Sequence, residues 1–295
     1  RTWCEETGLE GNIESFQIHW NSVKGFQLEA VIKDVKFLLP EELGIRWVAF
    51  SEGETHKLKG DSLLDVQEGK IIFDGQTLLL EDFQGDLQSP SVSGDSLPVP
   101  FRADIEISNF TSSGGKQGSE WMSTMLETAP FHAKFYIDRF NNLETGEGTV
   151  VLPQPVAQML KIFQLEHWSM NAEVSVGRTE LKGEIDVQGD MTIHAKEGKY
   201  VDFPYQLKNI RSDITFHKNE IQIVELKADG SEDAKVLIKG IVHVTQDDLA
   251  VELNLYAANA PIDEALHDAV SEQLATVMDK LIDYDAYEKI TNSLA

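Results

Sequence analysis

Apolar residues recur at every second position through most of the stretch from Trp168 to Ala257. In residues 168–176 the even positions are Trp, Met, Ala, Val and Val, whereas the odd positions are Ser, Asn, Glu and Ser. This is the period of a β-strand with one face on apolar material and the other in water. The pattern returns in residues 181–187, 191–193, 214–216, 221–223, 236–244 and 249–255. The stretch therefore predicts a meander of antiparallel strands.

Short turn-forming pairs separate these segments and set the expected strand boundaries. Gln188–Gly189, Lys218–Asn219 and Asp229–Gly230 each stand between two apolar segments. In the first half of the chain, Asp74–Gly75 lies between two apolar runs. This pair is typical of a tight hairpin because both residues tolerate a positive φ. Hairpins are therefore predicted in both halves.

The remaining segments complete the expected architecture. Further alternating strands are expected at residues 16–20, 26–32, 99–107 and 131–137, and short helices at 120–128 and 153–165. Residues 260–283 carry apolar side chains at spacings of three or four after Pro261, which predicts an amphipathic helix. We expect a mainly β chain in three parts: an N-terminal β segment over 1–130, a β segment over 131–259, and a C-terminal helix and tail over 260–295.

The charge balance excludes one class of partner. The chain of 295 residues has 25 Lys and Arg against 50 Asp and Glu, which gives a formal net charge of −25. Such a surface repels nucleic-acid phosphates, whose binding depends on Lys and Arg, and it repels anionic bilayers. The longest apolar runs are a few residues, far short of the roughly twenty that span a bilayer. We therefore expect no nucleic-acid partner, and membrane contact only through regions outside this sequence.

The beginning of the chain indicates that the sequence is part of something longer. It starts at Arg1, with no initiating methionine and no signal-peptide pattern. Cys4 is the single cysteine, so neither an internal disulfide nor a multi-cysteine metal site is possible.

No motif nominates an enzyme, a metal site or a cofactor. The eight histidines are scattered, with no pair at helical metal-ligand spacing. The acidic pairs Glu232–Asp233 and Asp247–Asp248 stand at turns, and their spacing matches no calcium loop. The glycines of residues 114–118 lack the order of a phosphate-binding loop. We therefore expect a non-enzymatic protein without catalytic residues, metal ligands or cofactor.

One segment pair indicates an internal repeat. Residues 70–87 align without gaps on residues 213–230, so that Ile71 matches Ile214 and Phe73 matches Phe216. Either a hairpin unit has been duplicated within an extended sheet, or two amphipathic hairpins align by chance. Both alternatives predict β structure, but only duplication predicts an elongated one.

Several phrases resemble the repeating unit of the AsmA-like and TamB-like proteins of bacterial envelopes. They are the run 153–163, the Phe-Pro-Tyr phrase at 203–205 with the following Asn209–Ile210, the segment 239–242, and the Asn-Ala-Pro phrase at 259–261. The resemblance covers roughly residues 150–270. Ser212 stands where the family usually has glycine.

The resemblance implies both a shape and a function. The shape is an elongated, twisted antiparallel β-sheet curled into an open groove, with short helices. The function is that of a bridge-like lipid-transfer protein in the periplasm or cell envelope of a diderm bacterium, with a role in outer-membrane biogenesis. Expected partners are phospholipid, other envelope proteins and further repeats of the same chain.

The alternation nominates the side chains that line such a groove. The candidate lipid-binding residues share the apolar face of the predicted strands; they are Phe101, Ile105, Ile107, Phe135, Ile137, Trp168, Met170, Val174, Val176, Ile185, Val187, Ile193, Phe216, Ile223, Val251, Leu253 and Leu255. The same side chains would equally form a closed core. The alternative function is therefore a structural or adaptor β-module of the envelope, with a dry core and an acidic surface that binds a partner or Ca²⁺.

Overall fold

The structure is a computed structural model that describes residues 10–21, 25–39, 47–51, 54–57, 62–88, 98–108, 128–141, 150–244, 249–261 and 264–270. The described chain is mainly β, with twelve antiparallel strands in one open, unclosed sheet and two short helices. The expected fold class is confirmed.

The strands and helices follow the alternating and helical periods of the sequence. Their bounds are β1 Glu10–Asn21, β2 Gly25–Leu39, β3 Trp47–Ser51, β4 Glu54–Lys57, β5 Ser62–Phe73, β6 Leu78–Gln88, β7 Val99–Ile107, β8 Phe131–Asn141, β9 Val150–Pro153, α3 Gln154–Ile162, β10 Glu166–Arg178, β11 Asp186–Tyr200, β12 Phe203–His217, β13 Glu220–Asp229, β14 Lys235–Val244, β15 Leu249–Ala258 and α4 Glu264–Ala269.

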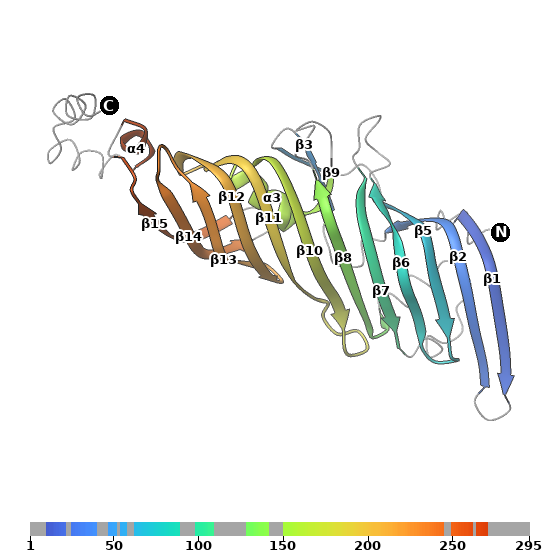
Figure 1. Cartoon of the computed structure of the whole chain (residues 1–295). Helices are drawn as coiled ribbons and strands as arrows, with labels where there is room; N and C mark the ends of the chain where they lie inside the picture. Colours follow the sequence, from blue (N-terminus) through green and yellow to red (C-terminus); the bar gives the residue numbers. More distant parts are fainter. Residues whose placement is uncertain are drawn as a thin grey trace.

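The large sheet is a long twisted strip whose strands lie almost in chain order (Figure 1). The order is β1-β2-β5-β6-β7-β8-β10-β11-β12-β13-β14-β15. Strands β3, β4 and β9 leave this order and form a separate three-stranded sheet, β4-β3-β9. The strip continues across residue 130, because β7 pairs with β8. Most connections in the strip are local, since each strand pairs with the next along the chain except where β2 pairs with β5 and β8 pairs with β10.

The predicted meander is confirmed as β10 to β15, with one boundary in a different place. Residues 181–185 form the connection before β11, and Gln188–Gly189 lies inside that strand instead of forming a turn. Gly189 pairs with Val174 on one side and with Phe216 on the other. A Cβ atom at Gly189 would lie 2.7 Å from the Phe216 ring. The glycine therefore serves close packing within the sheet, a use that local turn propensity does not reveal.

The Asp74–Gly75 turn joins β5 to β6 as predicted. Gly75 has a φ of +96°, which favours glycine. The Asp74 carboxylate accepts hydrogen bonds from the backbone N–H groups of Thr77, at 2.7 Å, and Gln76, at 2.9 Å. These bonds hold the pKa of Asp74 below its usual value, because they stabilise the charged form.

The two segments of the internal repeat form hairpins with matching geometry. Ile71 pairs with Leu80 in β5–β6, and the matching Ile214 pairs with Ile223 in β12–β13. The register to the following strand shifts between Leu80 and Phe83 in one hairpin and between Ile223 and Leu226 in the other. These positions also correspond in the alignment. The shared register and bulge support duplication of a hairpin unit.

Helix α3 and the three-stranded sheet pack on the apolar face of the strip. Val156, Met159, Leu160 and Phe163 belong to the same core cluster as Trp168 and Met170 of β10, together with Val48, Phe50, Val150 and Leu152 of the small sheet. The helix end is also fixed by backbone hydrogen bonds, because Lys199 N–H donates to Phe163 O at 2.9 Å and Val201 N–H donates to Ile162 O at 3.0 Å. The middle of the strip is therefore covered from one side.

The helix predictions have mixed outcomes. Helix α3 confirms the helix expected within 153–165. Helix α4 begins at Glu264 and ends at Ala269, within the expected 260–283, and Ala269 is buried in the core. Ala260 and Pro261 precede the helix, and residues 271–295 lie outside the described part. The helix expected at 120–128 also falls outside it, apart from Thr128.

Candidate functional site: the apolar face of the strip

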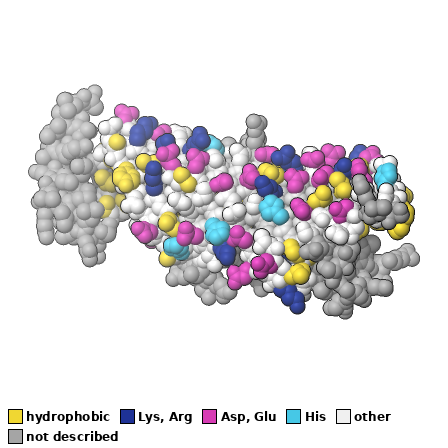
Figure 2. All heavy atoms as spheres, turned by 90° about the horizontal axis from the view of Figure 1, so that it is seen from below, with side chains coloured by type: hydrophobic (Ala, Val, Ile, Leu, Met, Phe, Trp, Pro, Cys, Tyr) yellow, Lys and Arg dark blue, Asp and Glu magenta, His cyan; other side chains and the backbone are white. Residues whose placement is uncertain are grey.

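The period of two gives the strip one polar and one apolar face. In β12, Leu207, Ile210, Ser212 and Ile214 are buried, whereas Lys208 and Arg211 between them are exposed. Figure 2 shows one side of the strip, where acidic and basic side chains intermingle and hydrophobic ones occur in small groups. Charged side chains therefore gather on this solvent-facing side of a chain whose formal net charge is −25.

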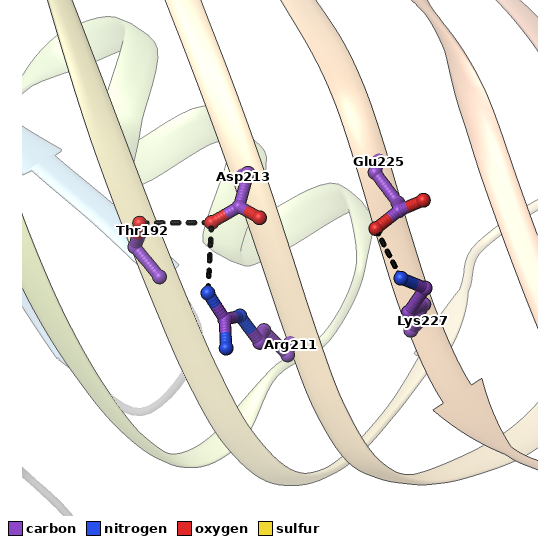
Figure 3. A network of polar contacts seen from close by, with 5 residues as sticks. All are labelled: Thr192, Arg211, Asp213, Glu225 and Lys227. Atoms are coloured by element: carbon purple, nitrogen blue, oxygen red, sulfur yellow. Dashed lines mark hydrogen bonds and ion pairs between the residues drawn. The ribbon is translucent and has the colours of Figure 1, made fainter.

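Polar side chains of β11, β12 and β13 form contacts both between strands and along one strand (Figure 3). Thr192 Oγ1 donates to Asp213 Oδ1 at 2.9 Å, and Arg211 Nη2 lies 3.8 Å from the same oxygen. Lys227 forms an ion pair with Glu225 of the same strand, β13. Exposed pairs of this kind contribute little stability each. Their exposure marks this face as the solvated side.

The predicted groove residues come together on the apolar face. All of them except Leu255 belong to, or pack against, two adjoining hydrophobic clusters. The larger cluster runs from Ile32 to Ala269, and the smaller one lies around Ile107, Phe131 and Val176. Ile185 packs against the smaller cluster from the connection before β11 and not from a strand.

Most of this face forms a packed core and is not exposed to solvent. Trp168 and Met170 are each 2% exposed, Ile223 is 1% exposed and Ile193 is fully buried. Phe101, Ile107, Ile137, Val174 and Val176 are also buried, while Ile105, Phe135, Val187, Phe216, Val251 and Leu253 are half-buried. The ring centroids of Phe140 and Trp168 lie 5.3 Å apart. The middle of the strip thus provides stability through close packing.

Arg178 and Tyr200 each place a polar group next to the apolar face, where it forms a hydrogen bond. Arg178 is 5% exposed, and its Nε donates to the carbonyl oxygen of Ala129 at 3.1 Å. Burial lowers the pKa of the Arg178 guanidinium from its ordinary value. Tyr200 donates from its hydroxyl to Asp202 Oδ2 at 2.9 Å, and burial together with this bond raises the pKa of Tyr200 to about 12. Arg178 thus links the end of β10 to Ala129, and Tyr200 links the end of β11 to Asp202 in the following turn.

Among the described residues, no element covers the N-terminal end of the strip. On β1, Ile13 is 65% exposed, Phe16 67%, Ile18 51% and Trp20 77%. A register shift between Ile13 and Ser15 keeps all four on the face that carries the buried Ala30 and Ile32 of β2. We call these four residues the β1 stripe. Burying such a side chain stabilises by roughly 1.5–3 kcal/mol, so leaving four of them uncovered is unusual for a folded chain.

The sequence prediction of the groove did not include the β1 stripe. The alternation of residues 16–20 predicted a strand, but the predicted groove residues all lie between Phe101 and Leu255. Alternation identifies a face, whereas only the fold shows where covering elements are missing. At the other end of the strip, Leu255 on β15 is 41% exposed, so this predicted residue also lies on an uncovered part of the face.

A hollow of about 450 Å³ lies over β10 to β13. Its lining includes Glu173, Asp190, Thr215, His217 and Glu220. In the described residues, no three His, Cys, Asp or Glu side chains are placed to hold a metal ion. None of the described helices is long and apolar enough to span a bilayer.

Ser212 offers a test of how dry the core is. Its side chain is 1% exposed, and its hydroxyl has no hydrogen-bond partner among the described residues. Because a buried, unpaired hydroxyl is destabilising, Ser212→Ala should raise the free energy of unfolding by about 1 kcal/mol. Urea unfolding followed by circular dichroism measures this change. A loss of stability in Ser212→Ala would mean that the hydroxyl has a partner, such as a buried water.

The fold and this site define the class of protein: an open antiparallel β-strip with one solvated acidic face and one apolar face, covered in the middle and bare at the β1 end. Comparisons with known protein families, curated proteins and solved structures give no match.

Proposed function

We propose that this chain binds phospholipid acyl chains along the apolar face of its open sheet and conducts them between membranes, without catalysing a reaction. The observation that carries the proposal is the β1 stripe, where four large hydrophobic side chains in one row are 51–77% exposed. An acyl chain covers such a row without needing polar partners. The strand rises about 3.3 Å per residue, so the stripe is long enough for much of an acyl chain.

The continuity of the apolar face supports conduction as well as binding. The β1 stripe lies beside the buried Ala30 and Ile32, and Ile32 belongs to the core cluster that extends to Ala269. Conduction requires the cover formed by α3 and the small sheet to admit lipid. The phrases that resemble the AsmA-like and TamB-like proteins support a periplasmic or envelope location, with membrane contact supplied by flanking regions.

Lipid extraction and mass spectrometry of the purified chain, after exhaustive detergent removal, test this function. We expect phospholipid at a stoichiometric level, and its loss in the double variant Phe16→Thr/Trp20→Thr, because threonine keeps strand propensity but removes the apolar surface. The matched control is Val224→Thr, which alters a 44% exposed side chain of β13 outside the stripe. A chain that stays folded, soluble and free of lipid would contradict the proposal.

The second candidate is a structural or adaptor β-module of the envelope whose acidic surface binds a partner. The burial of Trp168, Met170 and Ile193 favours it, because a filled middle leaves no continuous path. Lipid bound only at the β1 end, with none reaching a photoreactive residue placed at Ile223, would favour this module over a conduit.

A further inference from the structure

The chain contains two Asp–Gly pairs, and the structure describes both of them. Asp74–Gly75 forms the turn between β5 and β6, and Asp229–Gly230 lies at the end of β13. An aspartate followed by glycine is prone to react with itself, because glycine has no side chain to shield its backbone nitrogen from the aspartyl carboxyl group. Whether that nitrogen reaches the carboxyl carbon depends on the fold, and the two pairs differ in this respect.

The Asp74 carboxyl group is turned toward the backbone that follows it. Its Oδ1 atom accepts hydrogen bonds from the N–H groups of Gln76, at 2.9 Å, and Thr77, at 2.7 Å. The Gly75 nitrogen lies between Asp74 and these two donors along the chain, and none of the described residues accepts a hydrogen bond from it. The Asp74 side chain is exposed, so water reaches the turn.

The same two donors favour an attack on the carboxyl carbon of Asp74. Negative charge develops on the carboxyl oxygens when a nitrogen adds to this carbon. The N–H groups of Gln76 and Thr77 already point at Oδ1, so they stabilise that charge without rearrangement. The turn therefore brings together an electrophilic carbon, a nearby nitrogen and two donors for the developing charge.

Both reacting groups of the second pair are engaged elsewhere. The Gly230 N–H donates to the carbonyl oxygen of Ala234 at 2.9 Å, and Gly230 is buried. The Asp229 carboxylate accepts hydrogen bonds from Asn209 Nδ2, at 2.8 Å, and from Lys235 Nζ, at 2.7 Å. A reaction at Asp229 therefore requires this turn to open first.

Ionisation does not distinguish the two pairs. The hydrogen bond from the Thr77 N–H lowers the pKa of Asp74, and the hydrogen bond from Lys235 lowers the pKa of Asp229. Both carboxyl groups are thus charged at neutral pH, and the reaction, which removes a carboxyl hydroxyl group, is slowed at both. The difference between them comes from geometry.

We propose that Asp74 is a site of spontaneous isoaspartate formation in the folded chain, whereas Asp229 is protected. The Gly75 nitrogen forms a bond to Cγ of Asp74, which closes a succinimide ring. The carboxyl hydroxyl group and the Gly75 amide proton leave as water. A second water opens the ring: cleavage of the new C–N bond restores aspartate, and cleavage of the original peptide bond gives isoaspartate. Mass is unchanged, and no oxidant takes part.

Isoaspartate at position 74 alters the turn in two ways. The main chain gains one carbon atom, and the carboxylate moves to Cα, so the hydrogen bonds to Gln76 and Thr77 are lost. The new α-carboxylate is the group that isoaspartyl methyltransferases esterify with S-adenosylmethionine, which defines the class of enzyme that recognises the altered turn. This inference does not depend on the proposed lipid binding.

Incubation of the folded chain at neutral pH and body temperature, followed by peptide mapping with electron-transfer fragmentation, tests the proposal. This fragmentation distinguishes isoaspartate from aspartate in peptides of equal mass. We expect isoaspartate to accumulate at least about tenfold faster at position 74 than at position 229, because the reaction at 229 waits for local opening. In guanidinium chloride, which unfolds the chain, the two rates should become similar.

Asp74→Ser is the matched control. Serine keeps an oxygen that accepts hydrogen bonds within the turn but has no carboxyl carbon. Methyl incorporation by a purified isoaspartyl methyltransferase should therefore be mostly lost in this variant, and circular dichroism checks that it is folded. Equal rates at the two positions of the folded chain, a faster reaction at position 229, or no isoaspartate at position 74 would each overturn the proposal.

Discussion

Replacing Ile193 by aspartate is expected to prevent the strip from folding at neutral pH. Ile193 is fully buried, between Met170 of β10 and Ser212 of β12. An unpaired carboxylate in such a place costs several kcal/mol, against a total stability of about 5–15 kcal/mol for a typical domain. We expect loss of the cooperative thermal transition, measured by circular dichroism and by the yield of soluble protein.

The neighbouring residue is the control for this experiment. His194 lies on the same strand, is exposed, and pairs with Ser169 and Arg211 on the polar face. His194→Asp should change stability by less than about 0.5 kcal/mol. Equal effects at both positions would show that the two faces are not divided as described. A stable Ile193→Asp chain would indicate that the apolar face opens to water, as a lipid-filled groove does when emptied.

Gly240→Ala is expected to produce the second large effect, by separating β14 from β15. A Cβ atom at Gly240 would lie 2.1 Å from the carbonyl oxygen of Glu252 and 2.9 Å from Cα of Leu253. These are backbone atoms of the paired strand, so no side chain can turn away to relieve the overlap. We expect a loss of roughly 2–4 kcal/mol in the free energy of unfolding, measured with urea.

Gly183→Ala provides the comparison. Gly183 lies in the connection before β11, where a Cβ atom would be no closer than 3.2 Å to the nearest atom, the carbonyl oxygen of Glu180. We expect a change of less than about 1 kcal/mol there. If Gly240→Ala were as mild as Gly183→Ala, the close approach of β14 and β15 would be relieved by a small movement of the edge strand.

The requirement for glycine at position 240 also bears on the resemblance to envelope lipid-transfer proteins. Gly240 belongs to the phrase 239–242, one of those on which the resemblance depends. In this chain it has a physical reason that is independent of ancestry, because it lets the last two strands approach closely. Two unrelated sheets whose strands approach equally closely would both need glycine at this position, and would therefore share this part of the phrase. The proposed lipid function therefore depends on the lipid measurement and on the β1 stripe.

Local sequence determined the elements more completely than their boundaries. The alternation in residues 168–176 and 99–107 predicted strands β10 and β7, because side chains on a strand must alternate between water and core whatever lies around them. The Asp74–Gly75 turn was predictable for a similar reason, since the positive φ is a local requirement. Gly189 misled the prediction because its purpose is a contact with Phe216, a residue of the next strand.

The candidate site was likewise predictable in part from the sequence and in part only from the tertiary structure. Sequence determined which side chains share the apolar face: the period of two places Trp168, Met170 and Ile193 on it. Only the tertiary structure decided which of them are covered. Helix α3 and the β4-β3-β9 sheet pack over the middle of the strip and leave the β1 stripe bare. Covering is a contact between segments far apart in the chain, and alternation within one strand carries no information about which distant segment packs on it.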